Sequence, residues 1–222
     1  MRILSGRLKE IYDVIPYGLD VVADIGADHG KLIVAILLKN KAQRGFALDI
    51  SEKSLDKAKI LAEERNLLDR LSFFVGDGFL PISEEKVDYA IIAGMGGHET
   101  ISILKQKNCV DTYVLSPHQD SHVVRKFLRD NGYFIISDFI IFDKKYYPII
   151  ITKKGINTYT DDELYLGKNS PSRQEFFDKN VSRLEYLYNL LKDADRNLKS
   201  KPLSDEIIKE YEVLTKWHNS AK

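Results

Sequence analysis

The sequence lacks the features that mark secreted and membrane proteins. Its 222 residues include a single cysteine, so no disulfide can form within the chain, and we expect a reducing, cytoplasmic setting. We interpret Cys109 as a buried or loop thiol and expect no metal site, because it has no partner cysteine at a ligand spacing. No apolar run approaches the roughly 20 residues that a membrane span needs, and residues 1–10 contain no apolar signal-peptide core, so we expect no membrane partner.

Excess charge of one sign is also absent. The chain has 33 basic and 33 acidic residues, which excludes the overall basic excess that is typical of nucleic-acid binders. Locally, however, residues 116–154 carry seven basic side chains against four acidic ones. A modest positive patch is therefore expected there, with a solvated helix face and hairpin as the alternative interpretation.

Strand and helix patterns alternate five times along the first two thirds of the chain. The predicted strands are residues 21–25, 44–50, 71–75, 87–93 and 112–115. The predicted helices are residues 3–15, 29–39, 51–66, the segment from the glycine turn to about 107, and 120–131. Such alternation predicts a parallel sheet that is covered by helices on both faces.

The pattern then changes twice. Residues 133–142 and 146–152 are apolar runs separated by only three residues, which predicts an antiparallel hairpin and a last strand that runs against the others. Residues 158–171 are polar and are expected to be irregular. Beyond them, apolar residues recur at helical spacing on either side of a break at residues 200–202, which predicts an antiparallel helical hairpin; they are Phe177, Val181, Leu184, Tyr188, Leu191, Ile207, Tyr211 and Leu214. We therefore divide the chain into domains 1–155 and 156–222.

Acidic or glycine-rich corners follow four of the predicted strands. They are Asp24-Ile-Gly26-Ala-Asp28-His29-Gly30, Asp49, Gly76-Asp77-Gly78 and Ala93-Gly94-Met95-Gly96-Gly97. Ligands of open α/β sheets bind at the edge where parallel strands end, so we expect these corners to form one site. Each corner alone could be an ordinary turn or helix cap, but four at one edge favour a ligand.

The chemistry of the corners favours adenosine attached to a cationic group. The first corner is not the G-x-G-x-x-G dinucleotide fingerprint, and Asp24 and Asp28 would repel a pyrophosphate but attract a sulfonium and an ammonium group. Asp49 lies 23 positions after Gly26, where a carboxylate can accept both ribose hydroxyls. Asp77 is expected to receive an adenine amino group, and its glycine neighbours allow the ring to approach closely.

These residues resemble the bacterial tRNA (adenine(22)-N1)-methyltransferase family over about residues 1–155. The resemblance rests on Asp24-Ile-Gly26-x-Asp28-His29, Gly76-Asp77-Gly78, Ile92-Ala93-Gly94-Met95-Gly96-Gly97, Ser116-Pro117, Lys145-Tyr146-Tyr147 and Ser5-x-Arg7-Leu8. It implies a class I methyltransferase: a Rossmann-like, seven-stranded α/β sheet with a C-terminal helical, coiled-coil-like hairpin domain. Many members have Gln-Pro-Asn where this chain has Ser116-Pro117-His118, and a Glu where it has Pro148.

The resemblance also implies an activity and roles for the residues. The expected reaction transfers a methyl group from the cofactor S-adenosylmethionine to N1 of adenine 22 in tRNA, by a chain that we take to be a monomer. The expected cofactor residues are Asp24, Gly26, Asp28, His29, Gly30, Asp49, Ile50, Asp77, Gly78, Ala93 and Gly94. The expected residues around the reacting base are Gly94, Met95, Gly96, Pro117 and His118. The expected tRNA contacts are Arg7, Arg125, Arg129, Lys144, Lys145 and Tyr146.

Three other functions stay open at this point. A methyltransferase of small molecules or of another RNA would share the cofactor corners. A nicotinamide-dependent oxidoreductase would need the missing third glycine and a catalytic acid on a substrate domain. A non-catalytic adenosine- or RNA-binding module would keep the site without the reaction.

Overall fold

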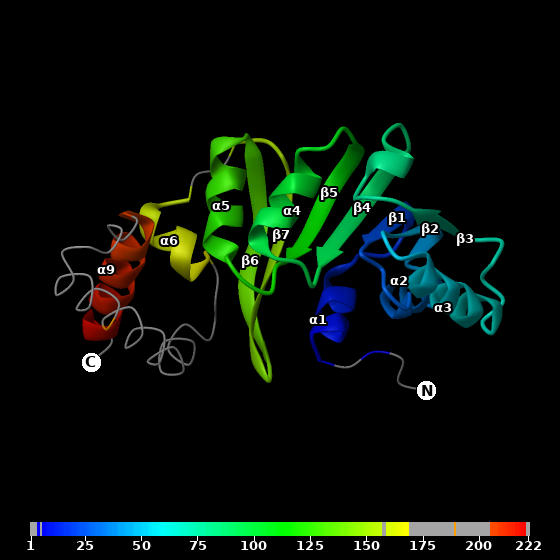
Figure 1. Ribbon diagram of the computed structural model, residues 1–222, viewed down its shortest axis with the longest axis horizontal. Coiled ribbons are helices and arrows are strands. Elements are labelled where there is room, and N and C mark those ends of the chain that lie inside the picture. Colours follow the sequence, from blue (N-terminus) through cyan, green and yellow to red (C-terminus); the bar gives the residue numbers. More distant parts are fainter. Residues whose placement is uncertain (1–3, 5, 157–158, 169–188, 190–204, 221–222) are drawn as a thin grey trace.

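A single seven-stranded sheet forms the centre of the molecule (Figure 1). The structure is a computed structural model that describes residues 4, 6–156, 159–168, 189 and 205–220. The strands are β1 (Leu19–Ile25), β2 (Ala42–Asp49), β3 (Leu71–Val75), β4 (Lys86–Ala93), β5 (Cys109–Ser116), β6 (Tyr133–Asp143) and β7 (Lys145–Lys154). Their order is β3-β2-β1-β4-β5-β7-β6, and β7 is antiparallel to both β5 and β6. The predicted fold class, including the reversed last strand, is confirmed.

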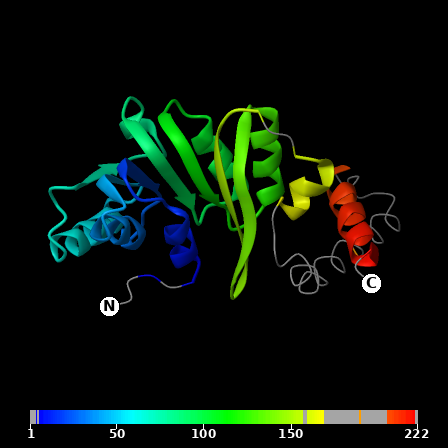
Figure 2. The ribbon, with the colours of Figure 1, turned by 180° about the vertical axis from the view of Figure 1, so that it is seen from behind.

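Helices cover both faces of this sheet (Figure 2). The first apolar cluster joins one face to α1 (Gly6–Val14), α2 (Lys31–Leu38) and α3 (Glu52–Glu63). The second joins the other face to the short helix η1 (Leu80–Ile82), α4 (Gly97–Leu104) and α5 (Ser121–Asp130). The helices up to β3 therefore cover one face of the sheet, and the helices between β3 and β6 cover the other.

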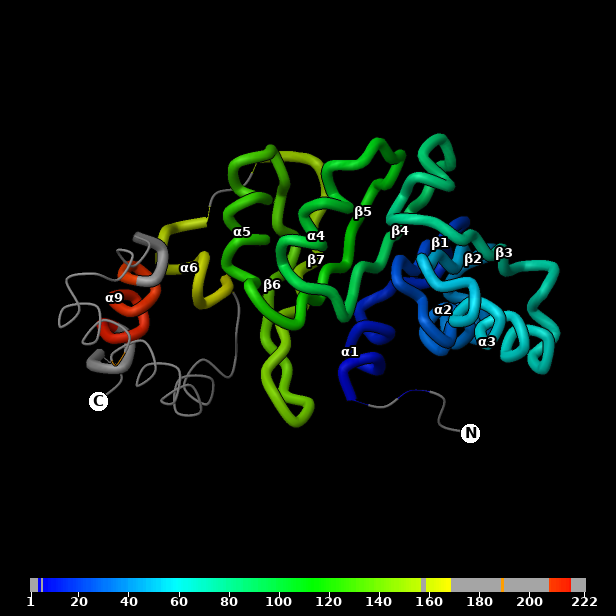
Figure 3. The backbone as a smooth tube through the Cα atoms, in the orientation of Figure 1, coloured from blue at the N-terminus to red at the C-terminus, as the bar shows by residue number. Residues whose placement is uncertain are grey.

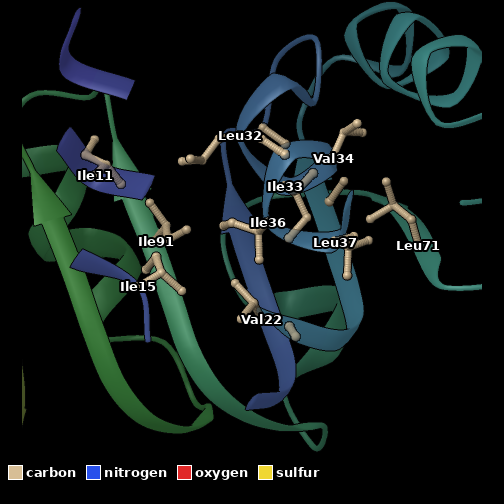
Figure 4. Packing of buried hydrophobic residues seen from close by; sticks show 14 of the residues in the cluster. Ile11, Ile15, Val22, Leu32, Ile33, Val34, Ile36, Leu37, Leu71 and Ile91 are labelled. Atoms are coloured by element: carbon tan, nitrogen blue, oxygen red, sulfur yellow. The ribbon is translucent and has the colours of Figure 1, made fainter. Parts of the chain in front are cut away.

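Strand β1 shows why the centre of the sheet is apolar. It pairs with β2 on one side and β4 on the other, and every residue from Val21 to Ile25 is buried. Val22 faces the first cluster, where side chains of α1 and α2 gather over it and Ile91, as Figure 4 shows. A strand buried on both faces needs the near-continuous apolar run that the sequence has here.

Several predicted boundaries are wrong by a few residues for local reasons. Helix α2 begins at Lys31 rather than at residue 29, because Asp28 and Gly30 adopt positive φ values of 49° and 66°. The β6–β7 connection is one residue, Lys144 with φ 63°, because Asp143 and Lys145 still pair. Strand β5 begins at Cys109, whose side chain is exposed, so its assignment as a buried or loop thiol is wrong.

The segment after the sheet contains a helix that the polar composition did not predict. Helix α6 (Asp161–Leu166) begins with a capping box in which Thr160 and Glu163 each bond the other's backbone N–H. Helix α9 (Asp205–Ser220) packs against α6, so the second predicted helix of the C-terminal region exists. The predicted first helix, with Phe177, Val181, Leu184, Tyr188 and Leu191, lies outside the described residues. The division at residue 155 stays a prediction.

A buried ion pair attaches α6 to the sheet. The Arg125 guanidinium on α5 donates to both carboxylate oxygens of Asp138 on β6, at 2.9 and 3.1 Å. Arg125 also donates to the Leu164 carbonyl of α6, and the Tyr159 hydroxyl donates to Asp138. Both charged side chains are at most 1% exposed, so the segment from 159 to 166 is held by a polar network inside the core.

We expect the Asp138→Asn substitution to destabilise the fold strongly. It leaves the Arg125 charge buried without an anion, which typically costs about 3–5 kcal/mol of the free energy of unfolding. The measurement is urea denaturation followed by circular dichroism. The control is Asp161→Asn, because Asp161 pairs with Arg129 and Lys209 at the surface and its loss should barely move the midpoint. Equal shifts for the two variants would contradict the role of the buried pair.

Candidate functional site

The turn after β1 has the backbone geometry of a ligand-binding loop. Gly26, Asp28 and Gly30 all have positive φ, and the N–H groups of Gly26 and Ala27 donate to the Leu48 carbonyl at the end of β2. A Cβ on Gly26 would lie 2.4 Å from Met95 Cε, so a larger residue cannot occupy this position without displacing Met95. The loop therefore depends on glycine for both its conformation and its close packing.

Asp49 is held in place at the end of β2 by two backbone donors. Its Oδ2 accepts from the N–H of Asp28 at 3.0 Å, and its Oδ1 accepts from the N–H of Ser51 at 2.9 Å. Ser51 caps α3, because its hydroxyl accepts from the N–H of Ser54. Each Asp49 oxygen keeps a second lone pair, so the carboxylate can accept two hydroxyl groups from a ligand.

The first cavity joins the corners of four strands. It has a volume of about 240 Å³ and is lined at its rim by Asp49, Ile50 and Asp77. The other predicted residues around it are Gly26, Gly78, Ala93, Gly94 and Met95. Three lining residues that the sequence analysis missed are Leu48, Glu99 and Ile103. The exposed Ile50 side chain offers an apolar surface beside the carboxylates of Asp49 and Asp77.

The second cavity lies on the other side of Gly26 and Gly94. It has a volume of about 310 Å³, and three of its lining residues are the predicted Asp24, Asp28 and His29. Arg7, Leu8, Lys31 and Leu32 also line it. Gly26, Ala93 and Gly94 line both cavities, so the two cavities are adjacent and meet at these residues.

The second cavity contains an acidic group with an unusual proton affinity. Asp24 is 5% exposed, and burial together with the nearby Asp49 charge raises the pKa of its carboxyl to about 7. The charged form of Asp24 is therefore costly in the free protein, and a cation in the cavity would favour it. His29 lies beside this loop, with its Nε2 3.0 Å from Lys57 Nζ and 3.5 Å from Asp28 Oδ1.

The third cavity lies beyond the glycine turn that follows β4. Its volume is about 90 Å³, and Pro117, His118 and Tyr146 are among its lining residues. The N–H of His118 donates to the Met95 carbonyl, and its Nδ1 lies 3.0 Å from the Gly94 carbonyl oxygen. The residues predicted around a reacting base are thus brought together next to the other two cavities. Gly96 joins them through a bridge to Gln119.

The predicted tRNA contacts do not form one surface. Arg125 is 1% exposed and bound to Asp138, so its assignment as a phosphate contact is wrong. Arg129 is paired with Asp130 and Asp161. Arg7 faces the second cavity, whereas Lys144 and Lys145 are exposed at the end of the hairpin.

Two further features were searched for among the described residues: a membrane-spanning helix and a metal-binding group of side chains. None of the helices in the described ranges has an apolar stretch of the length that a bilayer crossing requires. Among the same residues, His, Cys, Asp and Glu side chains do not gather in any group of three that could hold a metal ion.

Comparison with known proteins identifies relatives of this chain. The model of the family described as a methyltransferase domain matches residues 4–150. The chain is 31% identical to the tRNA (adenine(22)-N(1))-methyltransferase of Bacillus subtilis (strain 168) over 157 residues, which are 68% of this chain and 66% of that enzyme. It is 30% identical over 156 residues to the putative tRNA methyltransferase MG248 of Mycoplasma genitalium, covering 68% of this chain and 70% of that protein.

A solved structure extends the likeness of fold beyond this region. M. capricolum TrmK, solved in complex with S-adenosyl-homocysteine, aligns with a TM-score of 0.77 and 23% identity over 99% of this chain and 100% of that one. With the family model matching residues 4–150 and two relatives at 30% identity or more, the resemblance seen in the sequence is confirmed. The chain belongs to the methyltransferase-domain family.

Proposed function

We propose that this chain transfers a methyl group from S-adenosylmethionine to N1 of an adenine in tRNA, adenine 22. The observation that carries the proposal is a pair of adjacent cavities that share Gly26 and Gly94, one of nucleoside size and the other lined by charged side chains. The B. subtilis relative is named for this reaction, and a TrmK of the same fold binds S-adenosyl-homocysteine. A cytoplasmic setting, where tRNA is found, is part of the proposal.

The residues present fit this cofactor in both halves. In the first cavity, Asp49 would accept from the ribose hydroxyls and Asp77 from the adenine amino group, with Ile50 against the ring. In the second, Asp24 and Asp28 would attract the ammonium group of the methionine part, and Arg7 would bind its carboxylate. The backbone of Gly94, which carries no side chain, would lie between the nucleoside half and the methionine half of the cofactor, next to the reactive methyl group.

For the target adenine, the reaction depends on alignment of N1 with the methyl group more than on proton transfer. Bound S-adenosylmethionine supplies an electrophilic methyl group: the bond from carbon to adenine N1 forms as the bond from carbon to sulfur breaks, and that electron pair stays on sulfur. N1 uses its own lone pair, so the chain needs no strong general base. Met95, Pro117 and His118 would hold the adenine in line with the methyl group, which is how positioning accelerates a two-reactant step.

The tRNA must present its adenine unpaired or flipped, because N1 is hidden within a paired helix. The third cavity, lined by His118 and Tyr146, is the entrance that we assign to the base. Lys144 and Lys145 would contact phosphates beside that entrance, with an affinity that falls as salt rises. Arg129 remains a weaker candidate for a phosphate contact, because its charge is already paired.

The decisive experiment measures methyl incorporation from labelled S-adenosylmethionine into a tRNA transcript that carries adenine 22. We expect incorporation into this transcript and none into one with guanine at position 22, with N1-methyladenosine identified by mass spectrometry after digestion. Incorporation into both transcripts would move the target to another position. Incorporation into small molecules alone would favour the small-molecule enzyme, and cofactor binding without any transfer would favour the binding module.

The Asp49→Ala variant is expected to bind S-adenosylmethionine at least tenfold more weakly, a loss of about 1.4 kcal/mol. The reason is the removal of the proposed ribose acceptor, and calorimetry measures it. Asp88→Ala is a matched control, because Asp88 also accepts from two backbone N–H groups, those of Asp20 and Val21, but at the opposite edge of the sheet. Unchanged affinity in Asp49→Ala would refute the ribose assignment.

The Asp24→Asn variant is expected to be more stable than the natural chain at alkaline pH while binding the cofactor less well. The pKa of Asp24 is about 7 in the fold and near 4 when unfolded. The unfolded state therefore releases its proton first, and stability falls as pH rises between these values, by up to about 4 kcal/mol. Asparagine does not ionise, so this loss disappears.

Urea denaturation of both chains between about pH 4 and pH 8 tests the expectation. The difference in unfolding free energy between variant and natural chain should grow with pH and level off above about pH 7. Asp20→Asn, at an exposed position of the same strand, is the control and should not show this rise. A pH-independent difference for Asp24→Asn would disprove the buried, ionisable role.

A further inference from the structure

The N-terminus of α1 is joined to the end of the β6–β7 hairpin, 136 positions away in the sequence. The backbone N–H of Arg7 donates to Asp143 Oδ2 at 2.9 Å, so the carboxylate satisfies one of the free donors at the start of the helix. A Cβ on Gly6 would lie 2.0 Å from the same oxygen, and Gly6 has φ 54°. The hairpin extends past the other strands to reach this helix, and the two lie side by side (Figure 3).

The same junction holds the side chain of Arg7. Its guanidinium carbon lies 4.6 Å from the centre of the Tyr147 ring on β7, in a cation–π contact. One guanidinium nitrogen lies 3.3 Å from the point where a Cβ on Gly94 would be, and Arg7 lines the second cavity. The hairpin therefore fixes Arg7 twice, by its backbone through Asp143 and by its guanidinium through Tyr147.

Fixing Arg7 matters because of the charges around it. An amino-acid group bound in the second cavity carries an ammonium and a carboxylate. Asp24 and Asp28 suit the ammonium, and the carboxylate needs a cation. Arg7 and Lys31 both line this cavity, and Arg7 is the one whose guanidinium lies against Gly94. A free arginine side chain loses about 2 kcal/mol of rotamer entropy when it binds, and a guanidinium that is already held loses less.

We infer that Asp143 and Tyr147 are positioning residues, which hold the Arg7 guanidinium for the carboxylate of the methionine part of the cofactor. The inference rests on the proposed function and adds residues from the last two strands to a site otherwise built by the first four. Lys145, two positions before Tyr147 on β7, has its Nζ 5.1 Å from the centre of the same ring, so a second cation lies at this junction.

Two ligands separate a positioning role from a merely structural one. S-adenosyl-homocysteine has the amino-acid group, and 5′-methylthioadenosine has the same nucleoside without it. We expect Asp143→Ala and Tyr147→Leu to weaken the binding of S-adenosyl-homocysteine about five- to tenfold in calorimetry. Binding of 5′-methylthioadenosine should change less than twofold. In the methylation assay, KM for S-adenosylmethionine should rise while kcat at saturation stays nearly constant.

Two variants act as controls for this experiment. Tyr147→Phe keeps the aromatic face and should bind S-adenosyl-homocysteine like the natural chain. Asp13→Ala removes a carboxylate that pairs with Lys9 on the exposed side of the same helix, and should also leave binding unchanged. Thermal unfolding of each variant shows whether the chain is folded at the temperature of the binding assay.

The outcomes distinguish this inference from the proposed function. Equal weakening of both ligands, or no weakening of S-adenosyl-homocysteine, would overturn the positioning role while leaving the cofactor assignment in place. If the natural chain binds neither ligand, the proposed function itself fails. Selective weakening of S-adenosyl-homocysteine by Asp143→Ala and Tyr147→Leu, with rescue in Tyr147→Phe, supports the inference.

Discussion

The parallel pairing of β1 with β4 is the constraint on which the site depends. The register sets Ile25 beside Ile92, so the two glycine turns that follow these strands come out next to each other at one edge of the sheet. Met95 of one turn occupies the space that a side chain on Gly26 of the other would fill. Because both strands are buried and paired on both sides, the turns are held by the core itself, and the two cavities that share them keep a fixed relation.

Ionised carboxylates at this edge of the sheet lower the stability of the free fold. Asp24 is the clearest case, because burial and the charge of Asp49 both oppose its ionisation. The backbone offsets part of this cost at Asp49, because the N–H groups of Asp28 and Ser51 donate to its two carboxylate oxygens. A cationic ligand would relieve what remains, so the same residues that destabilise the free chain are those best suited to bind a sulfonium and an ammonium group.

The sequence predicted the features that depend on local pattern and order. Strand and helix alternation gave the parallel sheet, the short hairpin gave the reversed strand, and the four corners converge because parallel strands end at one edge. Boundaries failed where backbone conformation decides, as at Asp28 and Lys144, since positive φ at these non-glycine residues has no clear signal in a single sequence. Helix α6 was missed although Thr160-x-x-Glu163 is a capping-box pattern that could have revealed it.

Long-range pairing explains why the basic residues were the least predictable part of the site. Arg125 and Asp138 lie 13 positions apart on different elements, and neither pattern nor composition indicates that they meet inside the core. Arg7 was expected at a phosphate, yet it contacts the hairpin end and lines the second cavity. A count of charges along the chain treats every arginine as exposed, whereas in the fold Arg125 anchors α6 and Arg7 lines the second cavity. Lys144 and Lys145 are exposed at the hairpin end. The net charge of zero therefore does not argue against an RNA substrate, because the local arrangement of a few exposed cations sets the surface potential that a polyanion meets.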